Sequence, residues 1–277
     1  MKNIATTTKR PLNAIWLSDI HLGYKACRAE FVLDFLNKNP AKVIYLAGDV
    51  VDVWALKRQF MWPDSHQAVL KKLIDLAAAG NRVVYIPGNH DDHFRDLCNK
   101  TLLNIEIHRE AIHKTATGKR LLVLHGDEFD HCVRCSRLHW VAGELSYDAL
   151  LFINRWSNRF RNWMGLPYWS LAYYIKNRVN KARAAILAFE QAAATEAKKR
   201  GFDGIVCGHI HQPEIRIIDD VLYCNDGDWI ESCTALVEHN SGRLELLHWG
   251  DVQQAVKCDT AANDDNPPAL RLPSLAS

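Results

Sequence analysis

Val83-Val84-Tyr85-Ile86 is a short apolar run that leads directly into the polar sequence Pro87-Gly88-Asn89-His90-Asp91. An apolar run of this length, bounded by turn residues, is typical of a buried strand. Open α/β sheets bind their ligands at the carboxyl ends of their strands. Segment 83–91 therefore predicts a strand that delivers amide, imidazole and carboxylate groups to one edge of a sheet.

The same succession of an apolar run and metal-binding residue types occurs at four other places. Residues 14–17 precede Asp19-Ile20-His21, residues 43–47 precede Gly48-Asp49, residues 121–124 precede His125-Gly126-Asp127, and residues 205–207 precede Gly208-His209-Ile210-His211. Each motif alone is weak, because Gly-Asp is usually a turn or a helix cap and Asn-His-Asp a polar loop. In Asp-x-His and His-x-His, strand alternation is expected to put both side chains on one face. Together, five such motifs at the ends of five predicted strands indicate a metal centre.

Helical patterns separate the first three predicted strands. Apolar residues recur with helical spacing at positions 31–36 and again at positions 69–76, where Gly80 ends the pattern. Strands that alternate with helices predict a layered α/β fold. Further along, segments 214–218, 221–224, 234–239 and 243–249 are predicted to be short strands separated by polar turns.

The predicted domain organisation is an α/β core with an insertion. The two-sheet core is expected to comprise residues 12–130 and 201–250, and a helical stretch, 131–200, interrupts it. Residues 257–277 contain the polar, Pro-rich sequence Asp264-Asp265-Asn266-Pro267-Pro268 and are predicted to be a disordered tail.

The composition is that of a globular protein. The 277 residues are 48% hydrophobic and 24% charged, with a formal net charge of +2. Residues 1–10 have no apolar signal region, and no apolar run approaches the roughly 18–20 residues of a membrane span, so we expect a cytoplasmic protein. Its eight cysteines are expected to be reduced. Cys132 and Cys135 have the spacing of half a zinc site but lack a second pair, which favours ordinary thiols.

The ordered set of motifs resembles that of the calcineurin-like metallophosphoesterases. The resemblance rests on Asp19-x-His21, Gly48-Asp49-x-x-Asp52, Gly88-Asn89-His90-Asp91, His125-Gly126 and Gly208-His209-x-His211, and it extends over about residues 14–250. It implies a four-layer α-β-β-α sandwich with two metal ions at its edge.

The resemblance also implies a role for each motif residue. One metal is expected to bind Asp19, His21, Asp49 and His211, and the other to bind Asn89, His125 and His209, with Asp49 bridging the two. Mixed nitrogen and oxygen ligands suit Mn, Fe, Zn or Co better than Ca or Mg, and the resemblance favours Mn. His90 is expected to stabilise or protonate the leaving oxygen, with Asp91 orienting it. Asp52 and Asp127 are expected beside the ligands rather than on the metals.

The insertion is strongly basic and rich in aromatic residues. Residues 130–200 carry 12 Lys or Arg and 5 Asp or Glu, a balance of 12 − 5 = +7. The candidate phosphate contacts are Arg155, Arg159, Arg161, Lys176, Arg178, Lys181 and Arg183. An amphipathic helical subdomain with a small core of its own would also explain this composition. The more specific interpretation is a lid over the metals. Its basic groups would contact phosphates, and its aromatic and aliphatic groups would contact acyl chains or an anionic membrane surface. Binding of nucleic acid is a third alternative and is disfavoured, since no nucleic-acid module is recognisable.

The position of the insertion is similar to that in the UDP-2,3-diacylglucosamine hydrolases, which split a pyrophosphate in lipid A synthesis at the inner membrane. The segment Gly48-Asp49-x-x-Asp52-x-Trp54 adds to this likeness. His90 is a departure, because the best-known branch of these enzymes has Arg there. The resemblance implies a phosphorylated lipid substrate and peripheral contact with the inner membrane. The alternatives are a general phosphodiesterase or nucleotide pyrophosphatase with a soluble substrate, and a non-catalytic scaffold. The scaffold is disfavoured because all seven ligands and His90 are present.

Overall fold

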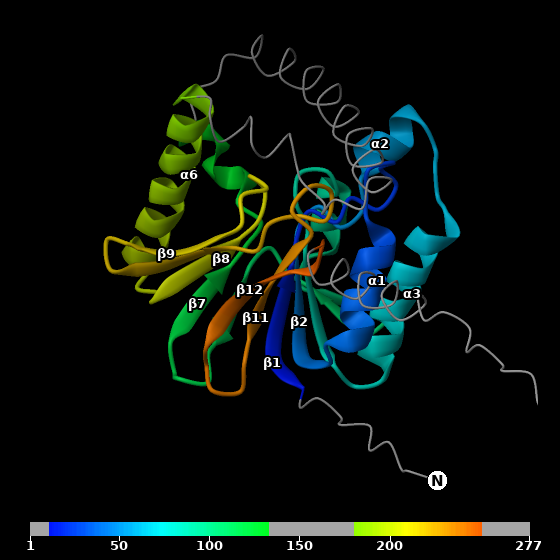
Figure 1. Ribbon diagram of the computed structural model, residues 1–277, viewed down its shortest axis with the longest axis horizontal. Helices are drawn as coiled ribbons and strands as arrows, with labels where there is room; N and C mark the ends of the chain where they lie inside the picture. The colour runs from blue at the N-terminus through cyan, green and yellow to red at the C-terminus, as the bar shows by residue number, and fades with distance from the viewer. Residues whose placement is uncertain (1–10, 133–179, 251–277) are drawn as a thin grey trace, which may run out of the picture.

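Two β-sheets form the centre of the computed structural model, which describes residues 11–132 and 180–250 (Figure 1). The seven-stranded sheet has the order β12 (Leu244–His248), β11 (Thr234–Glu238), β1 (Leu12–Leu17), β2 (Ala41–Ala47), β3 (Arg82–Ile86), β5 (Ile105–Ile107) and β4 (Lys100–Leu102). The five-stranded sheet has the order β6 (Ala111–Lys114), β7 (Arg120–Val123), β8 (Gly204–Cys207), β10 (Val221–Asn225) and β9 (Glu214–Ile218). Strands β1, β2 and β3 run parallel to one another, as do β7, β8 and β10.

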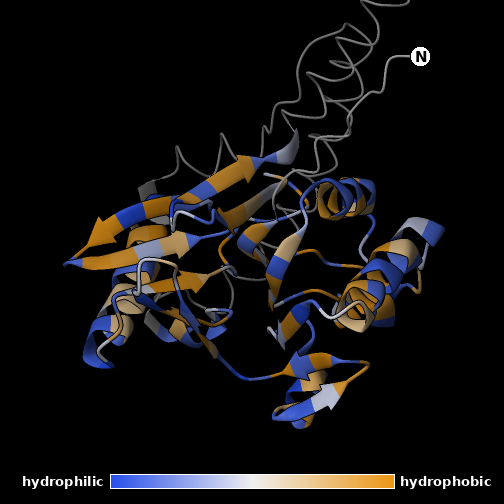
Figure 2. Cartoon of the chain, turned by 90° about the horizontal axis from the view of Figure 1, so that it is seen from below, coloured by the Kyte–Doolittle hydropathy of each residue, from blue (hydrophilic) through white to orange (hydrophobic). Residues whose placement is uncertain are grey.

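The central strands are largely apolar because both of their faces are buried. On β1, Ile15 and Leu17 belong to the core beneath the helices, whereas Ala14 and Trp16 face the core between the two sheets. The same alternation places Ile44 beneath the helices and Tyr45 between the sheets. Burial on both faces explains why these strands are continuous apolar runs instead of alternating with polar residues. The helices carry hydrophobic and hydrophilic residues, as expected for elements with one face on a sheet and the other toward solvent (Figure 2).

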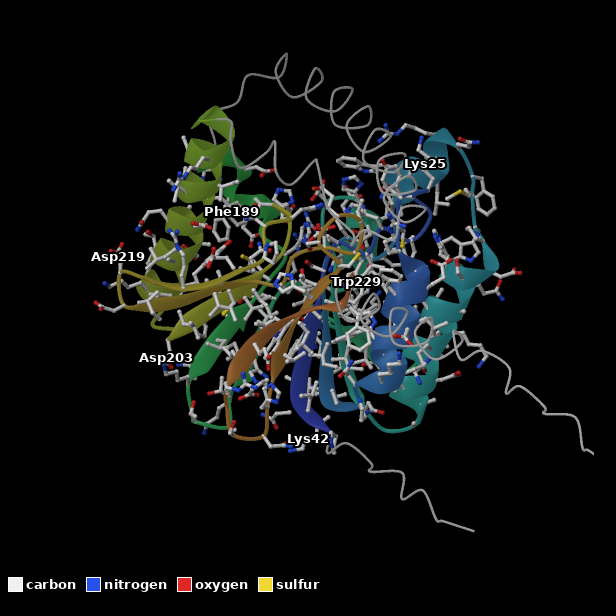
Figure 3. All side chains as sticks on the ribbon, in the orientation of Figure 1. Lys25, Lys42, Phe189, Asp203, Asp219 and Trp229 are labelled. Atoms are coloured by element: carbon white, nitrogen blue, oxygen red, sulfur yellow. The ribbon has the colours of Figure 1, made fainter. Side chains whose placement is uncertain are left out.

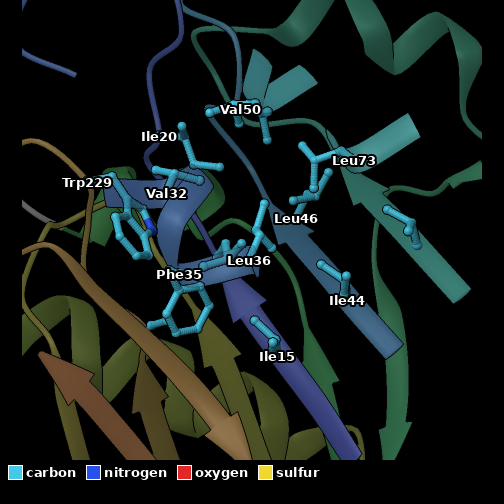
Figure 4. Packing of buried hydrophobic residues seen from close by; sticks show 14 of the residues in the cluster. Ile15, Ile20, Val32, Phe35, Leu36, Ile44, Leu46, Val50, Leu73 and Trp229 are labelled. Carbon is cyan, nitrogen blue, oxygen red and sulfur yellow. The ribbon is translucent and has the colours of Figure 1, made fainter. Parts of the chain in front are cut away.

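Helices cover the outer faces of both sheets. Helices α1 (Ala29–Lys38) and α3 (Asp64–Ala78) pack on the seven-stranded sheet, where Phe35 and Leu36 of α1 meet Ile15 and Trp229 (Figure 4). Helix α6 (Asn180–Lys199) packs on the five-stranded sheet through Phe189 and its alanines. The layers are therefore helix, sheet, sheet and helix, which confirms the predicted four-layer α-β-β-α sandwich.

Most of the predicted elements are confirmed, with boundaries that differ by a few residues. The helical patterns at 31–36 and 69–76 lie in α1 and α3, and the four late strands are β9 to β12. Several short elements were not predicted: α2 (Val53–Arg58), the 3₁₀ turns η1 (Asp92–Leu97) and η2 (Asp127–Cys132), and strands β4, β5 and β6. The α2 helix has no buried residue, and β4 is exposed along its whole length, so neither has an apolar pattern to detect.

The predicted division into core, insertion and tail stays a prediction. Most of the insertion and the whole tail fall in residues 133–179 and 251–277, which lie outside the described part of the chain. Within that part, the structure contains no helix that is both long and apolar enough to cross a bilayer.

Candidate metal centre

The predicted ligands all lie in loops at the carboxyl ends of parallel strands. Asp19 and His21 follow β1, Asp49 follows β2, and Asn89 follows β3. On the second sheet, His125 follows β7, and His209 and His211 follow β8. Because the two sheets pack face to face, these loops meet at one edge of the sandwich. Side chains separated by up to 192 positions in the sequence, from Asp19 to His211, share a single cluster there.

The first group of potential ligands is Asp19, His21 and His211, whose ligand atoms all lie within 4.8 Å of one another. Asp19 Oδ1 lies 3.1 Å from Nε2 of His211 and 3.8 Å from Nε2 of His21. The carboxylate and the two imidazoles therefore point their donor atoms at a common space. This geometry suits one divalent cation.

The second group is Asp49, His125 and His209, and its ligand atoms also lie within 4.8 Å of one another. Asp49 Oδ2 lies 3.4 Å from Nε2 of His125, and the same nitrogen lies 3.2 Å from Oδ1 of Asn89. The structure thus brings together the residues predicted for the second metal. Their assignment as ligands stays a prediction.

Asp49 connects the two groups. Its Oδ2 atom lies 3.9 Å from Nε2 of His21, on the side of the first group, and 4.0 Å from Nε2 of His90. Its other oxygen, Oδ1, accepts a 2.8 Å hydrogen bond from the backbone N–H of His90. A carboxylate in this position is suited to bridge two cations.

Hydrogen bonds fix the orientation of the imidazoles. His21 donates from Nδ1 to Oδ2 of Asp52 at 3.0 Å, and His125 donates from Nδ1 to the carbonyl of Ala47 at 2.9 Å. A carboxylate or carbonyl can only accept, so Nδ1 of each ring carries a proton and Nε2 faces the cluster. Metal-binding histidines are typically held by this kind of second hydrogen bond.

The buried polar atoms of the cluster provide a direct test of whether cations fit. Asp19 Oδ1 and His21 Nε2 are buried and have no hydrogen-bond partner. The other oxygen of Asp19, Oδ2, accepts hydrogen bonds from the Ser18 hydroxyl at 2.6 Å and from the backbone N–H of His209 at 2.9 Å. Leaving a buried polar atom unpaired costs about 1–3 kcal/mol. A cation would satisfy the very atoms that lack partners, so the residues fit the two-metal site.

A second carboxyl group, Asp226, lies behind Asp19. The Ser18 hydroxyl is 2.6 Å from Asp19 Oδ2 and 2.7 Å from Asp226 Oδ1, but it has only one hydrogen to donate. Burial raises the pKa of Asp226 well above its ordinary value. A protonated Asp226 that donates to Ser18, while Ser18 donates to Asp19, satisfies both contacts.

The ligand loops are held in an unusual backbone conformation. Positive φ angles occur at Asp19 (50°), His21 (54°), Asp49 (53°), His209 (68°) and His211 (52°). These residues lie in left-handed loops and not in strands. The prediction that strand alternation turns Asp19 and His21 the same way, and likewise His209 and His211, is therefore wrong. Left-handed residues of this type are uncommon and cost energy, and they concentrate at functional sites.

Gly88 shows how closely these loops approach one another. A Cβ atom at this position would collide with Oδ1 of Asp49 and would lie 2.7 Å from the ring of His125. Only glycine leaves room for the carboxylate and the imidazole to meet at this point. The glycine of the Gly-Asn-His-Asp motif is thus explained by packing at the cluster.

Carboxylates and imidazoles shift each other's pKa values in the cluster. Burial opposes ionisation of Asp19, but His211 and His21 hold the pKa of its carboxyl group well below the ordinary value. Burial also opposes the charged form of His21, yet Asp19 and Asp52 raise its pKa to about 10. The pKa of His125 is raised well above its ordinary value because Asp49 outweighs burial. Without cations, the charged forms of His21 and His125 are therefore favoured, and metal binding would displace one proton from each ring.

His90 is oriented by a different residue from the one expected. Its Nδ1 lies 3.1 Å from Oδ1 of Asp52, and Trp54 packs on its ring with centroids 4.3 Å apart. The Asp91 carboxylate instead accepts hydrogen bonds from the backbone N–H groups of Gly88 and Val50 at 2.6 and 2.8 Å. The tyrosine hydroxyl of residue 85 adds a third at 2.6 Å. Asp91 thus holds the loops together, and the orientation predicted for it belongs to Asp52.

Asp127, which was predicted to lie beside the ligands, contacts Arg95. Its carboxylate makes two hydrogen bonds, 2.7 and 2.8 Å, to one terminal nitrogen of Arg95. This contact ties the turn after β7 to the turn after β3. Asp130, which belongs to none of the five motifs, lies 2.7 Å from Nε2 of His209.

The basic candidates of the insertion cannot be placed at the cluster. Arg155, Arg159, Arg161, Lys176 and Arg178 lie outside the described residues, as does Cys135. Lys181 falls within α6, but its side chain is not described, and Arg183 is exposed on the same helix. Their role as phosphate contacts stays a prediction.

Comparison with known proteins is in keeping with this geometry. Residues 12–213, well over half of the chain, match the family described as calcineurin-like phosphoesterase. A UDP-2,3-diacylglucosamine hydrolase of Porphyromonas gingivalis is 31% identical over 91 residues, which cover 33% of this chain and 34% of that protein. A protein of the same name from Blochmanniella pennsylvanica is 28% identical over 123 residues, which cover 42% and 47%. The matches thus span less than half the length of either relative.

Solved structures resemble the chain only weakly, at low sequence identity. A novel archaeal phosphodiesterase is 12% identical, with a TM-score of 0.43, and the match covers 84% of this chain and 98% of that one. The phosphoesterase Yfce from E. coli is 15% identical, with a TM-score of 0.42, and the match covers 85% and 98%. The family match, together with the two-sheet architecture and the clustered ligands, identifies the chain as a member of the calcineurin-like phosphoesterase family.

Proposed function

We propose that this protein is a two-metal hydrolase that cleaves a phosphate anhydride or ester, with a UDP-2,3-diacylglucosamine-like pyrophosphate as its substrate. The observation that carries the reaction type is the pair of ligand groups joined through Asp49. Partial matches to two UDP-2,3-diacylglucosamine hydrolases support the substrate class.

The residues of the cluster would divide between two cations. Asp19, His21 and His211 would hold the first cation, Asn89, His125 and His209 the second, and Asp49 both. Bound cations at such a site supply Lewis-acid charge to the phosphoryl group and lower the pKa of the attacking water. The mixed nitrogen and oxygen donors favour manganese, with iron, zinc and cobalt as the alternatives.

His90 is placed to act on the leaving group. Asp52 holds its Nδ1, so the opposite nitrogen, Nε2, points toward the cluster and lies 4.0 Å from Asp49 Oδ2. Trp54 covers one side of the ring and limits its rotation. From this position Nε2 can donate a proton or a hydrogen bond to the departing oxygen.

The identity of residue 90 also supports a second candidate function. The best-known lipid A hydrolases have Arg at this point of the motif, whereas His is the general pattern of the family. A soluble phosphodiester or nucleotide pyrophosphate is therefore the alternative substrate. Peripheral contact with the inner membrane belongs to the lipid proposal alone.

Turnover with added Mn²⁺ tests both candidates. The purified chain would be assayed on UDP-2,3-diacylglucosamine, on UDP-sugars without acyl chains, and on a chromogenic diester. A kcat/KM for the acylated substrate well above that for the UDP-sugars supports the lipid proposal. Cleavage of the diester or of UDP-sugars, but not of the acylated substrate, would refute it in favour of the alternative. No turnover of any of them would refute the phosphoesterase activity itself.

A further inference from the structure

Three of the imidazoles predicted to bind metal, those of His21, His125 and His209, have one nitrogen held by an oxygen atom outside the predicted ligand set. Asp52 fixes His21 and the Ala47 carbonyl fixes His125, and both of these partners are buried. The partner of His209 is Asp130, whose side chain is 63% exposed. The second ligand group therefore depends on a contact that reaches it from the surface.

The contact determines which nitrogen of His209 can face the cluster. Nε2 lies 2.7 Å from Oδ1 of Asp130, and because a carboxylate only accepts, Nε2 must carry the proton. The lone pair of the neutral ring is then on Nδ1. The ring lies edge-on to His125 with centroids 5.0 Å apart, next to Asp49. Without Asp130, the neutral ring could equally place its proton on Nδ1, where it would oppose a cation.

Asp130 is itself held in place by packing of the η2 turn. Phe129, its neighbour, is buried against Phe189 of α6, with ring centroids 5.6 Å apart and nearly perpendicular planes. Phe189 lies on the side of α6 that faces the five-stranded sheet (Figure 3). The paired hydrogen bonds between Asp127 and Arg95 fix the start of the same turn. The carboxylate of Asp130 is therefore exposed, but its backbone is anchored.

We propose that Asp130 is a positioning residue for the cation held by Asp49, Asn89, His125 and His209. It fixes the proton of His209 on Nε2, so that Nδ1 is presented to the metal. This inference rests on the proposed two-metal function. It goes beyond that function by assigning the affinity of one of the two sites to a residue outside the motifs.

The test compares metal binding by three forms of the full chain. Wild-type protein, Asp130→Ala and Asp130→Asn would be dialysed against graded Mn²⁺ and analysed for bound metal. We expect two Mn per wild-type chain. Loss of a residue that holds a metal ligand typically weakens metal affinity by roughly 10–100-fold, so Asp130→Ala should weaken one site by that factor and leave the other unchanged. Asp130→Asn keeps an acceptor oxygen and should restore most of the lost affinity.

Glu128→Gln is the matched control. It removes one negative charge from the same turn, while its side-chain oxygen can still accept from the backbone N–H of Gly126. Mn binding should be unchanged in this control if the position of the Asp130 carboxylate, rather than the negative charge of the turn, determines the metal affinity. Losses in Glu128→Gln and Asp130→Asn that are as large as the loss in Asp130→Ala would overturn the proposal.

Nitrogen-15 NMR of the metal-free chain at pH 8 provides a readout that a purely structural role would not change. The His209 ring should shift from the Nε2–H form toward a mixture of tautomers in Asp130→Ala, while the melting temperature stays that of wild type. Two equally tight sites in Asp130→Ala would overturn the role of Asp130 and leave the two-metal function standing. A wild-type chain that binds fewer than two Mn would refute the two-metal function itself.

Discussion

Asp52 makes three hydrogen bonds that an asparagine cannot reproduce. Its Oδ1 accepts from the backbone N–H of Ala55 at 2.7 Å and faces His90 Nδ1 at 3.1 Å, and its Oδ2 faces His21 Nδ1 at 3.0 Å. In Asp52→Asn one oxygen becomes an NH₂ group, which can only donate. The amide must therefore turn its donor toward one of these partners.

The hydrogen-bond count decides which way the amide turns. With its oxygen in the Oδ1 position, the substituted side chain would keep two of the three contacts, to Ala55 and His90; turned the other way it would keep only one. At about 1 kcal/mol for each net hydrogen bond, the first orientation is favoured. His21 then faces a donor, so it must accept through Nδ1 and carry its proton on Nε2. That proton occupies the nitrogen that points at Asp19 and Asp49.

The expected result is therefore a loss of metal affinity and not primarily a loss of chemistry. Losing the support of a ligand should weaken the Asp19–His21–His211 site by roughly 10–100-fold, which corresponds to about 1.4–2.7 kcal/mol. Mn²⁺ titration gives the affinity, and kcat measured at saturating Mn²⁺ gives the chemical step. Asp52→Ala is a useful companion, because it also removes the N-cap of α2. It should lower the free energy of unfolding by about 1 kcal/mol more than Asp52→Asn does. A normal Mn²⁺ affinity combined with a reduced kcat in Asp52→Asn would refute this reasoning.

Three further predictions concern the metal bridge, the leaving group and the core between the sheets. Asp49→Ala should leave no measurable turnover, because it removes the shared ligand; a near-normal rate would contradict the two-metal arrangement. His90→Ala should retain metal but lose ~10² to 10⁴ in rate, mostly on substrates with poor leaving groups, and an equal loss on all leaving groups would argue against proton donation. Burial lowers the pKa of His113 despite its contact with Glu238, so the unfolded chain takes up a proton below about pH 6.5 before the folded chain does. As the pH is lowered from 7.5 to 5.5, the free energy of unfolding of wild type should therefore fall relative to that of His113→Gln. The fall should be at most about 1.4 kcal/mol per pH unit, as measured by urea unfolding.

The fold was predictable because the sheets are buried on both faces. A strand such as β2, with Ile44 beneath the helices and Tyr45 between the sheets, must be apolar at nearly every position. The ends of these strands were visible because polar ligand residues follow immediately. The helix α2 and the strand β4 contain no buried residue, and β5 and β6 are only three and four residues long, so these elements leave no comparable signal.

The membership of the candidate site was predictable, but its supporting contacts were not. Asp19 and His209 stand beside strand ends and could be recognised locally, although their left-handed backbone could not. Asp130 and Asp226 act on residues 79 and 208 positions away, and no local motif marks them. Asp52 and Asp91 both belong to the predicted motifs, and only the three-dimensional contacts show that Asp52 is the one that holds His90.

The same contacts bring imidazoles beside a cluster of buried carboxylates. Asp19, Asp49 and Asp52 are all buried, and three negative charges so close together would repel one another strongly if they were uncompensated. The carboxylates raise the pKa values of His21, His125 and His211, so protons on these imidazoles would supply compensating positive charge. Cations and protons are therefore alternative counter-charges for one preformed arrangement.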